Sequence, residues 1–134
     1  MIDITIMRMN APLHYASDKG HINAMQLLIE HGADVNKKNN WRWTPLHIAI
    51  ERGHTNAMQL LIEAGTDINE KNSRGQTPIH IALENGHIDA MQLLIETGAD
   101  INEKDKYGWT PLRWASQMGR ANAIELLESY GAHE

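Results

Sequence analysis

The chain has 134 residues, with 12 basic and 17 acidic side chains, a net charge of −5 and no cysteine. Without cysteine neither disulfides nor thiolate metal sites can form, and the excess of acid argues against general binding to nucleic acid. No apolar run approaches the length that spans a membrane, and Met1–Met9 lacks the charged start and sustained apolar core of a secretion signal. We therefore expect a cytoplasmic protein that binds neither nucleic acid nor a membrane.

One short phrase returns four times along the chain at an interval of 33 residues. Its copies are Ala11-Pro12-Leu13-His14, Thr44-Pro45-Leu46-His47, Thr77-Pro78-Ile79-His80 and Thr110-Pro111-Leu112-Arg113. A fixed period between about 20 and 50 residues is typical of stacked repeats, which bury their apolar faces against one another. The period predicts a single domain over 1–134, with a partial unit at 1–10 and repeats at 11–36, 37–69, 70–102 and 103–134.

The partial unit, Met1–Asn10, aligns with a segment between repeats and is rich in isoleucine and methionine. Such an apolar edge either folds back over the first repeat, which we favour, or marks a boundary cut from a longer protein. Ala11 stands where the later repeats have threonine, which weakens the cap of the first helix by about 1 kcal/mol.

Two short helices are expected in each repeat. A threonine caps the first helix and proline follows in its first turn, where the missing N–H has no partner. This helix is expected to run to about Glu51, Glu84 or Gln117. Glycine in the left-handed conformation ends both helices, at Gly53, Gly86 and Gly119 for the first and at Gly65, Gly98 and Gly131 for the second. The second helix carries an apolar stripe, represented by Ala57, Leu60 and Leu61, while Gln59 and Glu63 lie off it.

The stretch between the second helix and the next threonine is rich in turn formers and predicts a hairpin-like finger. Gly75 and Gly108 mark the tight bend in two of these fingers, but Arg42 holds that position in the finger of repeat two. A Cβ disfavours a positive φ. The finger of repeat two is therefore expected either to change its turn type or to hold local strain.

The repeat length and the elements Thr-Pro-Leu-His-x-Ala, Gly-His, Leu-Leu and Gly-Ala-Asp-x-Asn resemble the ankyrin-repeat family over nearly the whole chain. The resemblance implies an all-α solenoid of helix-turn-helix units with hairpin-like fingers in a single array. It also implies that His14, His47 and His80 bond the capping threonine and nearby backbone. The histidines of the Gly-His pairs, His21, His54 and His87, are implied to hold the turn between the two helices. Repeat four has Arg113 and Arg120 at these two positions, which leaves its network open.

Neither a metal site nor catalysis is expected. The two sets of histidines are not expected to bind a row of metal ions. Successive copies lie about 10 Å apart, whereas zinc ligands lie within about 2.1 Å of the ion. The sequence has no serine or cysteine nucleophile in a recognisable motif, no glycine-rich phosphate loop and no His-Glu-x-x-His pair. We expect a protein that is not an enzyme and needs no cofactor.

The variable positions of the repeats are the candidate contacts for a partner. The resemblance implies docking on the concave side, formed by finger tips and the exposed positions of the first helices. These positions are Asn40, Trp41, Trp43, Glu51 and Arg52 in repeat two, Ser73, Arg74, Gln76, Glu84 and Asn85 in repeat three, and Lys106, Tyr107, Trp109, Gln117 and Met118 in repeat four. Tryptophan, tyrosine and arginine dominate interface hot spots. Trp43 and Trp109 can instead pack across neighbouring fingers, so Trp41 and Tyr107 are the better candidates.

Basic residues gather in the fingers, which hold seven of the 12: Lys37, Lys38, Arg42, Lys71, Arg74, Lys104 and Lys106. A basic finger edge favours an acidic protein partner or phosphate. Glu70, Glu103 and Asp105 dilute this charge, and a merely solvated rim is an equal alternative.

Asn36, Asn69 and Asn102 are candidate modification sites. With the leucine and aspartate that precede them, they resemble the pattern that asparaginyl hydroxylases modify in ankyrin proteins of animals. Ala121, Glu125 and Glu128 give repeat four a polar outer face, which suits a C-terminal cap and a natural end of the chain.

Together these features predict a non-catalytic, monomeric module that binds a protein partner through its concave surface and finger tips. The alternative is a structural, designed or self-associating scaffold whose Met1–Asn10 edge meets another copy.

Overall fold

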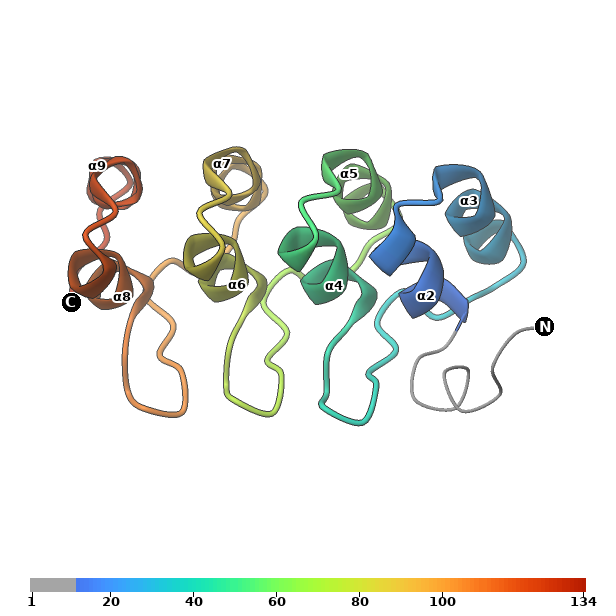
Figure 1. Cartoon of the computed structure of the whole chain (residues 1–134), viewed down its shortest axis with the longest axis horizontal. Coiled ribbons are helices and arrows are strands. Elements are labelled where there is room, and N and C mark those ends of the chain that lie inside the picture. The colour runs from blue at the N-terminus through green and yellow to red at the C-terminus, as the bar shows by residue number, and fades with distance from the viewer. Residues whose placement is uncertain (1–11) are drawn as a thin grey trace. The chain divides into compact units, whose positions relative to one another are not determined.

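The computed structural model describes residues 12–134, in which eight helices and no strand are found (Figure 1). The helices are α2 (Pro12–Lys19), α3 (Ile22–Glu30), α4 (Pro45–Glu51), α5 (Thr55–Glu63), α6 (Pro78–Glu84), α7 (Ile88–Glu96), α8 (Pro111–Met118) and α9 (Ala121–Ser129). The predicted all-α fold of paired helices is confirmed. The fold-back of Met1–Asn10 and the weakened cap at Ala11 lie outside the described residues.

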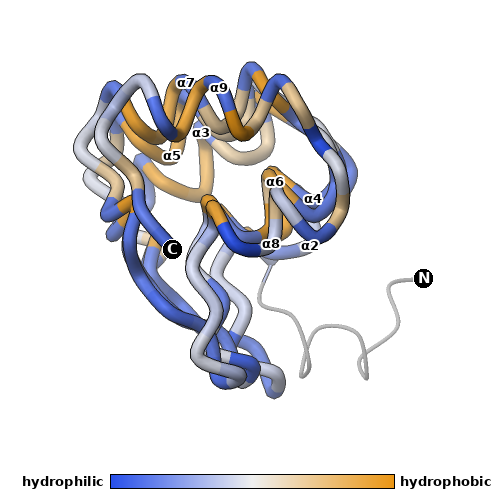
Figure 2. Tube along the Cα trace, turned by 90° about the vertical axis from the view of Figure 1, so that its left-hand side faces the viewer, coloured by the Kyte–Doolittle hydropathy of each residue, from blue (hydrophilic) through white to orange (hydrophobic). Residues whose placement is uncertain are grey.

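The chain divides into two compact units, Met1–Asp67 and Ile68–Glu134, and each contains two of the helix pairs. In the first unit α2 packs against α3 and α4, and α5 packs against α3 and α4. In the second unit α6 packs against α7 and α8, and α9 packs against the same two helices. The apolar residues concentrate on the helices, whereas the fingers are hydrophilic (Figure 2). Each helix pair therefore buries its apolar side against the neighbouring pair of its unit.

The second helices supply a large part of the core. In α5 the predicted stripe is buried at Ala57 and Leu61 and half-buried at Leu60, while Gln59 is exposed. The stripe also includes Met58, which the sequence analysis did not place in it. This methionine and its counterparts in α3 and α7 are at most 1% exposed: Met25, Met58 and Met91. An unbranched, flexible side chain fits the irregular gap between two helix layers.

Threonine caps begin α4, α6 and α8, as predicted. At α4 the Thr44 hydroxyl oxygen accepts the His47 N–H at 3.3 Å, and the His47 ring Nδ1 accepts the Thr44 N–H at 3.2 Å. The same reciprocal pair caps α6. At α8 Thr110 accepts the N–H of Arg113 at 3.2 Å. The arginine side chain has no acceptor, so repeat four keeps only half of this cap.

The bend of each finger is held by an asparagine or aspartate, which we call the anchor residue. In finger two (37–43) the Asn39 side-chain oxygen accepts the N–H groups of Trp41 and Trp43 at 2.9 and 3.0 Å. Asn72 in finger three (70–76) and Asp105 in finger four (103–109) make the matching pairs of bonds. The anchor role of these three residues was not predicted, although they recur at an interval of 33 residues.

Finger two keeps the turn of the other fingers in spite of Arg42. The N–H of Arg42 donates to the carbonyl oxygen of Asn39 at 2.9 Å, which matches the bond from Gly75 to Asn72. Arg42 has φ 61°, against 71° at Gly75 and 77° at Gly108. Of the two alternatives for this finger, the structure therefore selects local strain and not a change of turn type.

Replacing Arg42 by glycine is expected to raise the free energy of unfolding by about 1 kcal/mol, because glycine adopts a positive φ without a Cβ clash. Arg42→Ala is the matched control, since it removes the guanidinium but keeps the Cβ, and we expect no comparable gain from it. Urea unfolding followed by circular dichroism measures both. Equal stabilisation by the two variants would place the strain in the side chain and not in the backbone.

Long polar side chains join successive repeats within each unit. The ring Nε2 of His54 lies 3.0 Å from the carbonyl oxygen of Asp18 at the end of α2. His54 therefore bonds the start of the turn between α2 and α3, and this inter-helix turn belongs to the preceding repeat. In repeat four the Arg120 Nη2 donates to the carbonyl oxygen of Glu84 at 3.0 Å, and Glu84 occupies the register of Asp18. Arginine thus replaces histidine in the same bond, because both side chains can donate.

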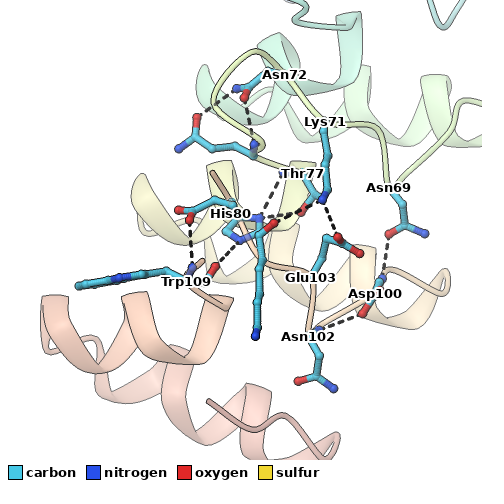
Figure 3. Close-up of polar contacts among 12 residues, drawn as sticks. Asn69, Lys71, Asn72, Thr77, His80, Asp100, Asn102, Glu103 and Trp109 are labelled. Atoms are coloured by element: carbon cyan, nitrogen blue, oxygen red, sulfur yellow. Dashed lines mark hydrogen bonds and ion pairs between the residues drawn. The ribbon is translucent and has the colours of Figure 1, made fainter. Parts of the chain in front are cut away.

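The histidines in the third position of the first helices also contact the following finger. His14 shows this contact without the cap, since its Nδ1 is buried with no hydrogen-bond partner among the described residues. The His14 Nε2 lies 3.0 Å from the carbonyl oxygen of Trp43, and the His80 Nε2 lies 3.4 Å from that of Trp109 (Figure 3). At His80 the Nδ1 accepts the N–H of Thr77 at 3.2 Å, so the neutral ring carries its hydrogen on Nε2. Protonation of Nδ1 would therefore break the bond from the Thr77 N–H to the ring, which is one half of the cap of α6.

Burial lowers the pKa of His80 and of His14, and it outweighs the backbone hydrogen bonds that raise the pKa values. Around His80 the charges of Asp105 and Glu103 also raise the pKa, whereas that of Lys71 lowers it. In the unfolded chain a histidine takes up a proton once the pH falls below its ordinary pKa of about 6.5. The unfolded state then binds more protons than the folded state, so stability falls as pH falls.

We expect the free energy of unfolding to decrease as pH is lowered through about 6.5, the ordinary pKa of histidine in the unfolded chain. His80→Gln should flatten this decrease, because glutamine in the third position of a helix can accept the Thr77 N–H but does not titrate. Thermal unfolding across this range measures the effect. An unchanged slope in the variant would show that His80 does not contribute to the acid sensitivity.

Candidate partner-binding site

The predicted contact residues include three large apolar side chains that the structure exposes. Trp41 is 52% exposed at the tip of finger two, Tyr107 is 64% exposed at the tip of finger four, and Met118 at the end of α8 is 38% exposed. Trp43 and Trp109 are half-buried. The ranking of Trp41 and Tyr107 above the other two aromatic residues therefore agrees with their exposure.

Trp43 and Trp109 pack within their own repeats. The ring centroid of Trp43 lies 5.7 Å from that of His47, and the ring centroid of Trp109 lies 4.3 Å from that of Trp114 in α8. These ring contacts are with the first helix that follows, and packing of the two tryptophans across neighbouring fingers stays an alternative prediction. Arg113 covers Trp109, with its guanidinium carbon 4.1 Å from the ring centroid.

The first unit has an open hollow beside finger two, lined in part by Trp41, Trp43 and Glu51. Arg52 also lines it, and its Nε donates to the Asp18 carboxylate at 2.7 Å. This ion pair raises the pKa of Arg52, first through the hydrogen bond and then through charge attraction. Arg52 is therefore already engaged by α2 in the absence of a partner.

The second unit has a pocket of about 200 Å³ between finger three with α6 and finger four with α8. The residues that line it are Arg74, Gln76, His80, Glu84, Asp105, Tyr107, Trp114 and Met118. Five of them belong to the predicted contact set, so the structure brings this part of the set together. His80, Asp105 and Trp114 were not predicted as contact residues.

Trp114 lines this pocket, and its indole, which we call the base of the pocket, is held by a bond that was not predicted from the sequence. Its indole Nε1 donates to the Asp105 Oδ2 at 2.6 Å, while Oδ1 of the same carboxylate holds the bend of finger four. Trp114 stands in the register of Ile48 and Ile81. Aspartate in place of the asparagine anchor supplies the second acceptor oxygen that the indole requires.

Some predicted contacts also have structural roles. Gln76 is half-buried, accepts from the Asn72 side chain and donates to the Glu84 carboxylate, each at 3.0 Å. The Asn85 side chain donates to the carbonyl oxygen of Ile81 at 2.9 Å. Asn40, Ser73 and Gln117 are exposed and are absent from the linings of the two hollows.

The basic finger edge is partly neutralised, as the dilution argument expected. The Lys71 ammonium lies 2.6 Å from the Glu103 carboxylate and donates to the carbonyl oxygen of Lys104 at 3.3 Å (Figure 3). The Lys106 ammonium lies 5.3 Å from the ring centroid of Tyr107, where it interacts with the aromatic face. The charge of finger four is thus placed beside its exposed aromatic side chain.

The three asparagines of the hydroxylation pattern hold successive repeats together within each unit. Asn36 Oδ1 accepts the Asp67 N–H at 2.8 Å, and Asn69 Oδ1 accepts the Asp100 N–H at 2.8 Å (Figure 3). Asn102 Oδ1 accepts the N–H of His133 at 3.1 Å. Their modification stays a prediction. These hydrogen bonds would have to break before the asparagine side chains could enter the active site of a hydroxylase.

Within residues 12–134 no three histidine, aspartate or glutamate side chains lie together in a group suited to a metal ion. No helix in the same described range has the length and apolar character needed to cross a membrane.

Comparison with known proteins identifies the class of fold. The family described as ankyrin repeats, in three copies, matches residues 3–72 and 65–133. The chain belongs to the ankyrin-repeat family, whose repeats are generally protein interaction modules and typically non-enzymatic.

Two curated plant proteins are similar to a short part of the chain. They are the probable E3 ubiquitin-protein ligase XBOS33 of Oryza sativa subsp. japonica and the E3 ubiquitin-protein ligase XBAT33 of Arabidopsis thaliana. Each is 55% identical over 31 residues, which is 23% of this chain and 6% of the relative. The similarity is therefore about as long as one repeat.

Proposed function

We propose that this chain is a non-catalytic module that binds a protein partner through its fingers and the ends of its first helices. The observation that carries the proposal is the exposure of Trp41 and Tyr107, at 52% and 64%, at the tips of two fingers. Large, rigid aromatic side chains bind partners with little loss of rotamer freedom, which is why they dominate interface hot spots.

The anchor bonds support the same function. Asn39 and Asp105 fix the bends that carry Trp41 and Tyr107, so the backbone under each aromatic side chain is ordered before a partner arrives. Preordered contacts lower the entropic cost of association. From the two plant ligases we carry over only the repeat itself, and ubiquitin transfer is not part of the proposed function.

Replacing Trp41 and Tyr107 together by alanine is expected to weaken partner capture about ten-fold or more. The helical content should be unchanged, since neither side chain is in the core. The measurement is affinity capture from the native cell lysate, with the captured proteins quantified by mass spectrometry. Tyr130→Ala is the matched control, because Tyr130 is a 49% exposed aromatic residue that follows α9 and lies outside the fingers.

Capture of the same partner by the double variant and the wild type in equal amounts would refute the proposed surface. The alternative of a self-associating scaffold is tested by sedimentation at several concentrations, where a strictly monomeric species removes it.

Modification at Asn36, Asn69 or Asn102 is tested by the intact mass after incubation with an asparaginyl hydroxylase. No added oxygen would discard that prediction.

A further inference from the structure

The pocket of the second unit is small and has a largely rigid base. Its volume of about 200 Å³ is below the range of about 300–1,000 Å³ that is usual for small-molecule and cofactor sites. A single large side chain suits this volume better than a cofactor. The exposed Tyr107 and Met118 form part of its walls, and methionine can adapt its shape to different apolar groups.

The base of the pocket is ordered by contacts on several sides. Asp105 holds the Trp114 indole N–H at 2.6 Å, and Trp109 packs on the same indole with centroids 4.3 Å apart. The three N–H groups that the Asp105 carboxylate accepts leave it committed to finger four and α8. Asp105 keeps its negative charge but has few lone pairs left to accept from a ligand, and Trp114 offers an apolar surface that is already in place.

The charges at the two ends of the pocket differ. At the finger end Arg74 lines the pocket. Lys106 does not line it, but its N–H donates to the Arg74 carbonyl oxygen at 3.0 Å and its ammonium lies 5.3 Å from the ring centroid of Tyr107, which does. Glu84 lies at the helix end, and one of its carboxylate oxygens accepts a hydrogen bond from the Gln76 side-chain amide. The finger end is thus cationic, and a carboxylate placed there would meet two positive side chains.

We propose that this pocket takes one large apolar side chain from an acidic peptide segment of the partner. The apolar side chain rests on Trp114 between Tyr107 and Met118, and a neighbouring aspartate or glutamate of the peptide pairs with Arg74 and Lys106. This inference rests on the proposed function and specifies the chemistry of the partner for one part of the surface.

The chain offers its own pattern for a test variant. The double variant D105N/W114I gives repeat four the anchor and helix residues of repeat three, Asn72 and Ile81, and so removes the indole base with residues that this fold already accommodates. Arg74→Glu reverses the charge at the finger end without changing the base. Lys37→Glu is its control, because it makes the same charge change on finger two in the other unit.

The probe is a library of short randomised peptides displayed on phage and selected on the wild-type protein. Dissociation constants of the selected peptides are then measured by fluorescence anisotropy with the wild type and the three variants, after circular dichroism has verified their folding. We expect peptides that combine one large apolar residue with aspartate or glutamate nearby. D105N/W114I and R74E should each weaken them about ten-fold, and K37E less than about two-fold.

Selection of lysine- or arginine-rich peptides, selection of none, or equal binding by wild type and R74E would overturn the inference. Its failure is distinguishable from failure of the proposed function. If the natural partner loses affinity for the Trp41→Ala protein but not for D105N/W114I, the module binds its partner elsewhere and only the pocket assignment is wrong. If no partner is captured at all, the proposed function fails with it.

Discussion

Replacing Gly75 by alanine is expected to lower the free energy of unfolding by about 2 to 3 kcal/mol. Gly75 forms the bend of finger three with φ 71°, where a Cβ costs about 1 kcal/mol or more. That Cβ would also lie 2.7 Å from the backbone nitrogen of Lys106, which donates to the Arg74 carbonyl oxygen at 3.0 Å. Relief of the overlap would separate the two fingers and break this bond. The two costs therefore add, and urea unfolding measures their sum.

Gly108→Ala separates the conformational cost of a positive φ from the cost of the overlap between fingers. Gly108 has φ 77° at the same place in finger four, but a Cβ there would have no heavy atom within 4 Å. Only the conformational cost of about 1 kcal/mol is expected. If both variants lose the same stability, the contact between fingers three and four contributes nothing measurable, and the larger value for Gly75 is wrong.

The helix pairs could be predicted from the sequence because their boundary signals are local. Thr44 with Pro45, and the glycines at the helix ends, act within one turn of the residues that they terminate. The recurrence of these signals at 33 residues then gave the number of repeats. Boundaries agreed to within a residue, with α4 and α6 ending at Glu51 and Glu84 as expected and α8 one residue beyond Gln117.

The bonds between repeats could not be predicted in the same way. His54 and Asp18 are 36 residues apart, and no local pattern shows that the ring reaches back to the end of α2. The replacement of this histidine by Arg120 looked like a departure from the repeat. In three dimensions it preserves the bond, because what the position requires is a donor of sufficient length and not a particular residue type.

The candidate site was predicted in part. Exposure favours Trp41 and Tyr107, since their positions at finger tips follow from the turn chemistry of the anchors. Trp114 was missed because a large apolar residue in the register of Ile48 and Ile81 resembles core. Asp105 was considered only as a negative charge on the finger. Its role becomes visible when its second oxygen is found to accept the indole N–H.

Asp105→Asn is expected to lower the free energy of unfolding by about 2 kcal/mol, although Asn39 and Asn72 serve as anchors in the other fingers. The asparagine Oδ1 can still accept the N–H groups of Tyr107 and Trp109. Its amide nitrogen, however, would face the Trp114 Nε1, so that two donors meet where a carboxylate now accepts at 2.6 Å. The anchor is 8% exposed, which leaves little access for water to satisfy either group.

The double variant D105N/W114I is expected to lose less stability than the sum of D105N and W114I, with a coupling energy of about 1 to 2 kcal/mol. W114I alone leaves a buried carboxylate oxygen without its donor, and D105N alone leaves the indole N–H without its acceptor. Together they recreate the asparagine, tryptophan and isoleucine of repeat two, Asn39, Trp43 and Ile48, where no indole N–H has to meet the anchor. Urea unfolding of the four proteins completes the cycle. Additive losses would mean that the bond from Trp114 to Asp105 does not stabilise the fold, and the preordered base of the pocket would lose its physical cause.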